Sequence, residues 1–420
     1  MKIAIVSDMH LGYERFRDDA RRQAGEALEK AAEASDMIII PGDIFDYRRP
    51  SPDVIAEAMA LFRNTMKKNF KARVSSFEGE GFAYTDVPII AIPGTHERRA
   101  QNAANPVSIL GMAGLVVDAS QARVTIEKTT AGKTEKVCVF GLGGIAEERF
   151  RETLKEVAPK GKEGCFNIFM FHQSVYELLP FSDSFIRIDD LPDGFDLYVD
   201  GHIHSRVEMK CHGRDFLIPG STVITQLKEN EQDSKGFFVY DTEERTYTFH
   251  RINSRKFAVE EIDVDRKGPA EIEELAREKA RKVIASSDGA KPIIRIVLAG
   301  KLGNGIKLHD VSVHGLAKEF QDSAILEVSK LGVKSEEIEQ EAMEIRTGEL
   351  ENASLRDYGL GVFMEKLNKA GYRLEFSPSE LFDLLSSDAK KEEVISTAIK
   401  MLSHRTADNG VTAAHLFKDQ

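Results

Sequence analysis

The chain contains no tryptophan and only three cysteines among its 420 residues. Such a sparse, odd set of cysteines excludes a small disulfide-bonded secreted domain and is typical of a reducing compartment. No apolar run approaches the roughly 20 residues that a membrane-spanning helix needs. A signal-peptide pattern is also missing, since an apolar run of strand length follows Met1 directly. We therefore expect a cytoplasmic protein.

An excess of positive charge is missing as well, because the formal net charge is −12. This balance is not the usual signature of a nucleic-acid-binding protein, so such a role would require a local basic surface. The 42% of apolar and 30% of charged residues are typical of globular domains. At 420 residues the chain is too long for one ordinary core, and we expect two or three domains.

The most informative stretch lies at the start of the chain. Residues 2–6 form a short apolar run that ends at Ser7, and Asp8 and His10 follow with one residue between them. In extended backbone, side chains two positions apart point the same way, so both could reach one ion. A carboxylate and a neutral imidazole suit Mn²⁺, Zn²⁺ or Fe²⁺. Taken alone, an aspartate after a strand is more often a cap or turn residue than a ligand.

The same pattern recurs at four further apolar runs of strand length. Each run is followed by an aspartate or a histidine: Asp43 after residues 37–40, His96 after 87–92, His172 after 166–171, and Asp200, His202 and His204 after 197–199. In an open α/β sheet, ligands bind at the carboxyl edge of the strands, where these side chains would meet. Isolated structural histidines would not all fall at one edge, so the set predicts a metal site.

These motifs resemble those of the calcineurin-like metallophosphoesterases. The resemblance rests on an ordered set: Asp8-x-His10, Gly42-Asp43, Gly94-Thr95-His96-Glu97, His172 and Gly201-His202-x-His204. Residues 8–13, 42–45 and 220–222 are similar to the double-strand-break repair nuclease branch, which comprises the meiotic-recombination-eleven nucleases and SbcD. The resemblance implies an α/β fold, with a metallophosphoesterase β-sandwich flanked by helices, a small α/β capping domain and a helical C-terminal tail.

In the resembled family, such residues hold two metal ions. By position, one ion would have three ligands and the other two: Asp8, His10 and His204 for the first, and His172 and His202 for the second. Asp43 would bridge the ions, and Thr95 stands where the family usually has an asparagine ligand. Two ions about 3.5–4 Å apart clamp a phosphodiester, activate a water for attack and stabilise the leaving oxygen. Mixed oxygen and nitrogen ligands favour two Mn²⁺ per subunit, with Fe²⁺ or Zn²⁺ left open.

His96 corresponds to the histidine that faces the scissile phosphate in the resembled family. It would stabilise charge on the leaving 3′ oxygen or protonate it, although a plain turn residue is the alternative. Glu97 stands where the family has aspartate and could still orient His96. The repair nucleases often have histidine at the position of Asp46, where a carboxylate would repel phosphate unless it binds a metal. The direction of exonuclease cleavage is therefore open.

Four arginines stand just after predicted site residues: Arg48, Arg49, Arg98 and Arg99. They are candidates for binding DNA phosphates beside the metal site. The alternative is that they are solvated loop residues.

The sequence pattern further divides the chain into five parts, the first two of which are named from the resemblance: a phosphoesterase core at 1–255, a capping domain at 256–332, a linker at 333–375, a helical segment at 376–405 and a frayed tail at 406–420. Within the core we expect helices at 16–34 and 51–70, an irregular loop at 69–86 and a hairpin at 123–142. The short amphipathic helices of 376–405 cannot bury their apolar faces alone.

Two partners follow from the resemblance. In the resembled family a helical tail binds an SMC-like coiled-coil ATPase, which would occupy the apolar faces of 376–405. Helices near 51–70 and 107–112 build a homodimer in that family, although packing within one chain explains their apolar positions equally well.

The leading hypothesis is a Mn²⁺-dependent DNA exonuclease and endonuclease in double-strand-break repair, acting on double-stranded ends and single strands with an ATPase partner. A second hypothesis is a metallophosphoesterase for small phosphoesters, which would need neither a capping domain nor a tail. A third takes Thr95 and Asp46 as signs of decay and leaves a scaffold that binds DNA ends. Retention of the other ligands and of His96 argues against the third.

Overall fold

The computed structural model describes residues 1–334 and residue 360, apart from residues 69, 79–87, 99–103, 182–184, 288–289, 304–305, 307–308 and 312–313. Nearly all of the predicted linker, the whole helical segment at 376–405 and the tail at 406–420 lie outside the described residues. The chain divides into two compact units, and one of them carries residues 1–262 with 273–298 and 312–329. Every helix among the described residues is too short or too polar to cross a bilayer.

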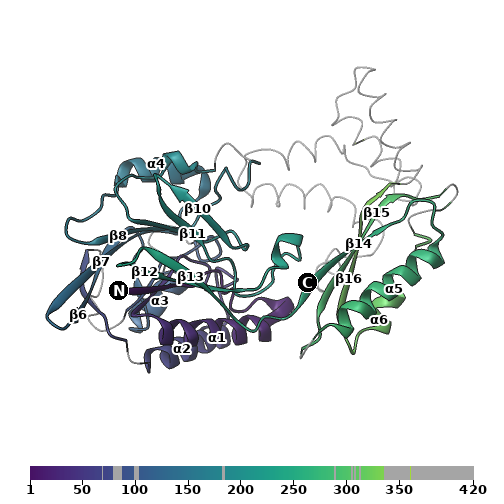
Figure 1. The fold of residues 1–420 in the computed structure, drawn as a ribbon, viewed down its shortest axis with the longest axis horizontal. Helices are drawn as coiled ribbons and strands as arrows, with labels where there is room; N and C mark the ends of the chain where they lie inside the picture. The colour runs from purple at the N-terminus through teal and green to yellow at the C-terminus, as the bar shows by residue number, and fades with distance from the viewer. Residues whose placement is uncertain are drawn as a thin grey trace, which may run out of the picture. The chain divides into compact units, whose positions relative to one another are not determined.

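Two facing sheets form the centre of the unit that contains residues 1–262 (Figure 1). The first has the order β13-β12-β1-β2-β4-β5, with β1 (Lys2–Ile5), β2 (Met37–Ile40), β4 (Ile89–Ala91), β5 (Val117–Asp118), β12 (Gly236–Asp241) and β13 (Thr246–Arg251). The second has the order β10-β11-β9-β8-β7-β6-β3, with β3 (Arg73–Glu78), β6 (Ala122–Thr130), β7 (Lys133–Leu142), β8 (Phe166–Phe171), β9 (Leu197–Asp200), β10 (Val207–Cys211) and β11 (Arg214–Ile218).

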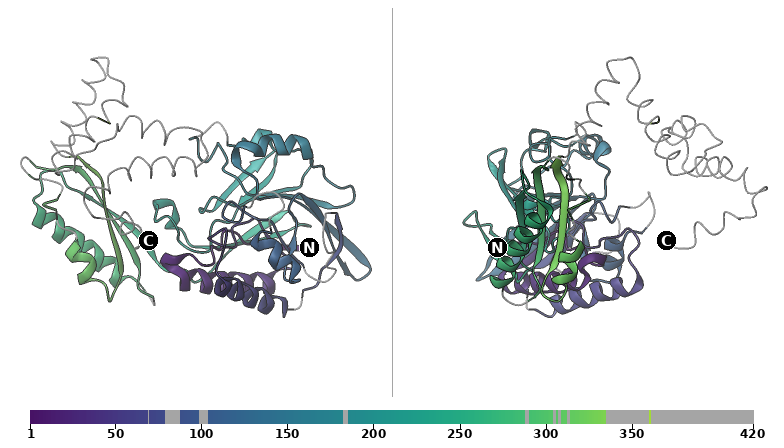
Figure 2. Two further views of the ribbon diagram at one scale, coloured as in Figure 1. Left: turned by 180° about the vertical axis from the view of Figure 1, so that it is seen from behind. Right: turned by 90° about the vertical axis from the view of Figure 1, so that its right-hand side faces the viewer.

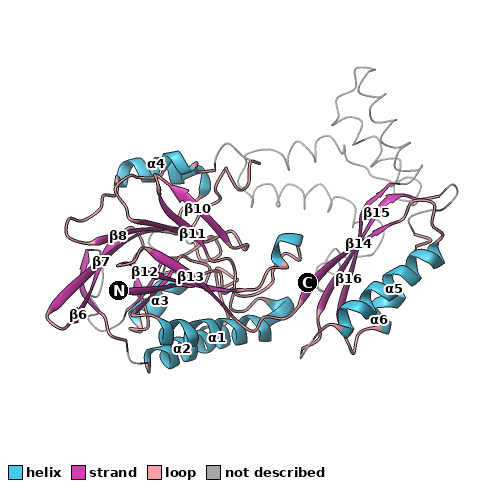
Figure 3. Cartoon of the chain, viewed as in Figure 1, coloured by secondary structure: helices cyan, strands magenta, loops and turns pink. Residues whose placement is uncertain are grey.

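Helices cover the outer face of each sheet, as the views in Figures 2 and 3 show. The first sheet carries α1 (Arg17–Ala34), α2 (Pro52–Met66) and α3 (Pro106–Met112), and the second carries α4 (Glu147–Val157). Because side chains alternate along a strand, Ile3 and Ile5 of β1 enter the core between the sheets, whereas Ala4 enters the core under the helices. Burying one such isoleucine stabilises the fold by roughly 1.5–3 kcal/mol. Strands buried on both faces therefore appear in the sequence as continuous apolar runs.

The predicted α/β class, with helices flanking two sheets, is confirmed. The expected helix at 16–34 is α1, and the expected hairpin at 123–142 is the pair β6–β7. The prediction of an irregular loop at 69–86 is wrong for Arg73–Glu78, which form the edge strand β3 against β6 with a bulge between Val74 and Ser76. The strand was missed because only Val74 in it is buried, so the usual apolar alternation is absent.

A three-stranded sheet follows in the order β14-β15-β16, with β14 (Phe257–Asp263), β15 (Ile293–Lys301) and β16 (Ile325–Lys334). Two helices connect its strands, α5 (Pro269–Ala285) and α6 (His314–Glu319). The region from residue 256 to 332 is therefore an α/β unit, as expected. Their role as a capping domain, and the boundary at residue 255, remain predictions.

Candidate metal centre

The predicted ligands follow the carboxyl ends of strands in both sheets. β1, β2 and β4 are parallel neighbours in the first sheet, and β8 and β9 are parallel neighbours in the second. Hydrogen bonds join the loops of the two sheets: Nδ1 of His172 lies 2.6 Å from the carbonyl oxygen of Pro41, and the backbone N–H of His202 donates to Oδ1 of Asp8 at 3.1 Å. The two carboxyl edges therefore meet at one place.

The first expected ligand set comes together there. Nε2 of His10 and Nε2 of His204 lie 3.1 Å apart, at 3.9 Å and 3.8 Å respectively from Oδ1 of Asp8. Asp8 and His10 are fully buried, and the side chain of His204 is 12% exposed. One carboxylate and two imidazoles thus offer ligand atoms that all lie within 4.8 Å of one another.

A second set, Asp43, His172 and His202, lies beside the first and has the same composition. Nε2 of His172 lies 3.2 Å from Oδ2 of Asp43, and the rings of His172 and His202 meet edge to face with centroids 5.2 Å apart. Oγ1 of Thr95 lies 3.3 Å from Nδ1 of His202. The threonine therefore borders this set, as the sequence predicted, with a hydroxyl in place of an amide.

Besides His202, whose Nδ1 lies beside the Thr95 hydroxyl, three of the ligand histidines have a hydrogen-bonding partner at Nδ1. The partners are the carboxylate of Asp46 for His10 (3.1 Å), the Pro41 carbonyl for His172 (2.6 Å) and the Thr225 hydroxyl for His204 (2.5 Å). Carbonyl and carboxylate oxygens only accept, so Nδ1 of His10 and of His172 carries the proton. Nε2 is then the nitrogen left for a metal, which is the usual arrangement around metal-binding histidines.

The electrostatics favour neutral imidazoles at His202 and His204 and an ionised carboxylate at Asp43. Burial lowers the pKa of His202 to about 4, and the neighbouring His172 contributes further. Burial and the nearby His10 hold the pKa of His204 well below its usual range. Burial raises the pKa of Asp43, but His172 outweighs it and holds the pKa of this carboxyl below its usual range. Neutral imidazole and ionised carboxylate are the forms that bind metals.

The second ligand set contains two buried atoms that lack hydrogen bonds. Among the described residues, neither Oδ2 of Asp43 nor Nε2 of His172 has a hydrogen-bond partner. Leaving a buried polar atom without one costs roughly 1–3 kcal/mol. Burial opposes protonation of His172, yet Asp43 raises the pKa of His172 to about 10, so in the absence of a metal a proton would join the pair. A divalent cation would satisfy both atoms, and the residues therefore fit such an ion.

The loops hold four of the ligands in left-handed backbone: Asp8 (φ 49°), His10 (φ 46°), Asp43 (φ 50°) and His202 (φ 69°). Such strain costs roughly 1–3 kcal/mol per residue and persists only where surrounding bonds determine it. Here the N–H of Asp8 donates to the Gly42 carbonyl at 3.2 Å, and the N–H of His10 donates to the Asp43 carbonyl at 3.1 Å. The loops after β1 and β2 thus fix each other.

Asp46 connects the ligands to His96. Oδ1 of Asp46 is the partner of His10 and lies 3.8 Å from Nδ1 of His96, and this nitrogen lies 2.5 Å from the Asp46 carbonyl oxygen. The side chain of His96 is 41% exposed, and its backbone N–H donates to Oδ1 of Asp43 at 2.9 Å. The carboxylate of Asp46 therefore holds a ligand instead of standing free against a phosphate, and Nε2 of His96 is left for a substrate.

Glu97 contacts the loop backbone. Its buried carboxylate accepts from the backbone N–H groups of Asp43 (3.1 Å), Phe45 (2.9 Å) and Gly94 (2.8 Å). Burial and the nearby Asp43 raise the pKa of Glu97 to about 8. Gly94 is required at its position, because a Cβ atom there would lie 2.2 Å from Oδ1 of Asp43. Glu97 thus shapes the loop that carries His96, whereas the sequence suggested that it orients the His96 ring.

The arginines that the sequence proposed for DNA binding differ in exposure. Arg48 and Arg49 are exposed on the loop after Asp46, beside Tyr47, whose exposure is 45%. Arg98 is half-buried, and Arg99 lies outside the described residues.

Sequence reasoning missed two residues that lie beside the ligands. Thr225 binds His204, and Oε1 of Glu147, at the start of α4, lies 3.5 Å from Nε2 of His202. Neither residue stands near its histidine in the sequence, so spacing gave no signal for them. The role of Asp46 as a partner of a ligand could have been suspected from the sequence, because Asp46 stands only three residues after Asp43 on the same loop.

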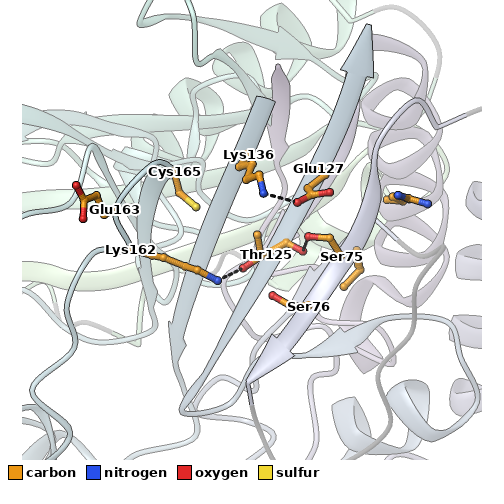
Figure 4. Close-up of a pocket in the computed structure, with 10 residues that line it drawn as sticks. Ser75, Ser76, Thr125, Glu127, Lys136, Lys162, Glu163 and Cys165 are labelled. Atoms are coloured by element: carbon orange, nitrogen blue, oxygen red, sulfur yellow. Dashed lines mark hydrogen bonds and ion pairs between the residues drawn. The ribbon is translucent and has the colours of Figure 1, made fainter. Parts of the chain in front are cut away.

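A separate pocket of about 500 Å³ lies on β3, β6 and β7 (Figure 4). Its lining includes Thr125, Lys136 and Lys162 but none of the metal-ligand candidates. Its lysines are engaged by protein groups, since Lys136 pairs with Glu127 at 2.8 Å and Lys162 lies 3.4 Å from the Thr125 hydroxyl. We assign it no part in the chemistry.

Residues 1–206 match the family model described as calcineurin-like phosphoesterase. The chain carries a calcineurin-like metallophosphoesterase domain. The predicted recognition of this family is thereby confirmed for residues 1–206. The matched residues include all of the candidate ligands and His96.

Proteins named as double-strand break repair proteins resemble the metallophosphoesterase domain and the region after it. The Mre11 proteins of Methanopyrus kandleri and Encephalitozoon cuniculi are both 29% identical to this chain, covering 70% and 57% of this chain and 66% and 45% of their own lengths. That of Sulfurisphaera tokodaii is 29% identical and covers 71% of this chain and 74% of its own. The chain spans less than two thirds of the length of the first two of these relatives.

Proposed function

We propose that this chain hydrolyses phosphodiester bonds of DNA with two divalent metal ions, as a nuclease in double-strand-break repair. The observation that carries the proposal is the meeting of two donor sets of equal composition beside an exposed histidine: Asp8, His10 and His204, then Asp43, His172 and His202, with His96. The choice of DNA as substrate rests on the relatives, which are named as double-strand break repair proteins.

The residues of the chain have separate tasks in this reaction. When bound, two divalent ions lower the pKa of a water for attack and neutralise charge on the phosphate. Asp43 would be the ligand shared by the two ions, and Oδ2 is the oxygen that its hydrogen bond to the His96 N–H leaves free. Asp46 holds both His10 and His96. His96 then stabilises charge on the leaving 3′ oxygen or gives it a proton.

The loop that carries Asp46 also supplies a surface for nucleic acid. Arg48 and Arg49 are exposed there and would neutralise phosphates. The exposed ring of Tyr47 would stack on a base, as aromatic side chains do in proteins that bind single strands. A local basic and aromatic surface of this kind permits DNA binding despite the net charge of −12.

The finer assignments are part of the proposal. The metal is Mn²⁺, which mixed oxygen and nitrogen donors accept, and the protein works in the cytoplasm. Residues 376–405 bind an SMC-like ATPase, and a homodimer forms through the helical region that includes α2 and α3.

Removal of metal is expected to abolish cleavage of DNA. The purified full chain would be incubated with linear duplex DNA, single-stranded DNA and a small aryl phosphodiester, each with Mn²⁺ and with a chelator. We expect Mn²⁺-dependent fragments from the DNA substrates, no products with the chelator, and recovery when Mn²⁺ is restored. Turnover of the aryl phosphodiester alone would contradict the proposal and would indicate a phosphoesterase for small substrates. Tight DNA binding without turnover of any substrate would replace it with a scaffold.

A further inference from the structure

A buried ion pair lies behind the metal ligand His204. Lys235 directly precedes β12, and Glu231 ends a short 3₁₀ helix, Glu229–Glu231. Their side chains are 5% and 2% exposed, and Nζ of Lys235 lies 3.3 Å from Oε1 of Glu231. Burying a pair of charges costs several kcal/mol per ion unless their remaining donors and acceptors are satisfied. The burial of this pair therefore depends on the other hydrogen bonds that the two side chains make.

Lys235 uses all three of its donors. Besides Glu231, its ammonium group donates to the carbonyl oxygen of His204 at 3.1 Å and to Oγ of Ser221 at 2.9 Å. The backbone N–H of Ser221 donates to the same His204 carbonyl at 3.1 Å. An ammonium has three N–H bonds, so this lysine is fully occupied in holding the backbone of His204 against residue 221.

Glu231 fixes the turn that faces the His204 ring. Its Oε1 accepts from the backbone N–H of Thr225 at 3.0 Å and from the Thr225 hydroxyl at 3.2 Å. Its Oε2 accepts from the backbone N–H of Gln226 at 2.6 Å. The carboxylate thus receives three bonds from this turn in addition to the one from Lys235.

The Thr225 hydroxyl connects Glu231 to the imidazole of His204. Oγ1 of Thr225 lies 2.5 Å from Nδ1 of His204. A hydroxyl has a single hydrogen. Because the carboxylate of Glu231 can only accept, the Thr225 hydroxyl donates this hydrogen to Glu231. The bond to His204 therefore needs a proton on Nδ1 of the ring. Nε2 is then unprotonated, and it is this nitrogen that lies 3.8 Å from Oδ1 of Asp8.

We propose that Thr225, Glu231 and Lys235 form a relay that positions His204 as a metal ligand. Lys235 holds the backbone of His204, Glu231 orients the Thr225 hydroxyl, and this hydroxyl selects the ring tautomer whose Nε2 can bind the ion. The inference rests on the proposed function, because it assumes that the first donor set holds a metal. The three are positioning residues, since none of them belongs to the donor sets.

The relay is tested by the Mn²⁺ affinity of the full chain without substrate, measured by titration calorimetry and by the electron paramagnetic resonance of free Mn²⁺. Thr225→Val keeps the shape of the side chain but removes the hydroxyl, whereas Thr225→Ser keeps the hydroxyl. We expect one of two bound Mn²⁺ ions to bind tenfold or more weakly in Thr225→Val, because lost outer partners typically weaken metal binding about 10–100-fold. Thr225→Ser should stay within about twofold of the parent chain.

A second variant and a control separate positioning from simple loss of stability. Glu231→Gln exchanges one acceptor oxygen for an NH₂ group and should weaken the same ion. Lys128→Met removes the cation of another largely buried pair, 2.8 Å from Asp36, and should leave both Mn²⁺ affinities unchanged. Histidine-ring ¹⁵N NMR of the metal-free chain should show the Nδ1–H form of His204, and a mixture of tautomers in Thr225→Val.

The outcomes distinguish the relay from the proposed function. If the parent chain binds two Mn²⁺ ions and Thr225→Val binds both equally well, the relay is overturned and the nuclease proposal stands. If the parent chain binds no Mn²⁺, the proposed function fails first. Both Thr225→Val and Glu231→Gln could instead unfold at lower urea concentrations while their Mn²⁺ affinities stay unchanged. That result would overturn the relay and leave these residues with a structural role alone.

Discussion

Replacing Asp43 with asparagine is expected to lower Mn²⁺-dependent DNA cleavage by at least about a thousandfold. The reason is the position of its two oxygens: Oδ1 accepts the N–H of His96, and Oδ2 faces Nε2 of His172 without a hydrogen-bond partner in the described part of the chain. An amide has only one oxygen, so it cannot fill both places. Losing an ion that contributes about 4 kcal/mol to transition-state stabilisation corresponds to about a thousandfold in rate.

The measurement is the rate of DNA cleavage together with the number of Mn²⁺ ions bound per chain. Asp53→Asn, on the exposed first turn of α2, makes the same chemical change away from the site and should cleave like the parent chain. Cleavage by Asp43→Asn at the parent rate would refute the assignment of this residue as a ligand.

Replacing His96 with alanine is expected to lower cleavage about 10²–10⁴-fold, the usual contribution of a positioned acid or base. The expected difference from Asp43→Asn concerns metal binding. The 41% exposed side chain of His96 belongs to neither donor set of the two-ion site, although with His10 and Asp46 it forms a third cluster of possible ligands. Both Mn²⁺ ions should therefore bind within about twofold of their affinities in the parent chain. KM for DNA should change less than kcat if His96 acts mainly on the leaving oxygen.

A matched control is offered by His250, a half-buried histidine of β13. His250→Ala should keep both the cleavage rate and the metal content. Loss of Mn²⁺ in His96→Ala would instead place His96 among the ligands and would remove its assigned role at the leaving group.

The site could be predicted because each ligand lies in the first few residues after a strand. Buried parallel strands such as β2 and β8 are continuous apolar runs, so the position where each one ends is visible in the local sequence. Parallel pairing then brings these ends to one edge. The residues at that edge, Asp8 and His172 among them, could therefore be predicted without knowing how the loops fold.

The partners that orient the ligands were harder to foresee. Thr225 reaches His204 from 21 residues away, and only the folded loops bring the two together. The edge strand β3 was missed for a related reason, since an edge strand with one buried side chain has little apolar alternation. Glu97 was assigned to the His96 ring by its place in the motif, but its burial directs the carboxylate to three backbone N–H groups, which carry no sequence signal.

The central claim is that the two donor sets each hold an ion, and one measurement tests it most directly. Crystals of the chain grown with Mn²⁺ would be measured for anomalous scattering at the manganese edge. We predict two peaks, the first among Asp8, His10 and His204 and the second between Asp43 and His172. Saturating Mn²⁺ with no peak at either set, or with Mn²⁺ bound only elsewhere, would contradict the claim.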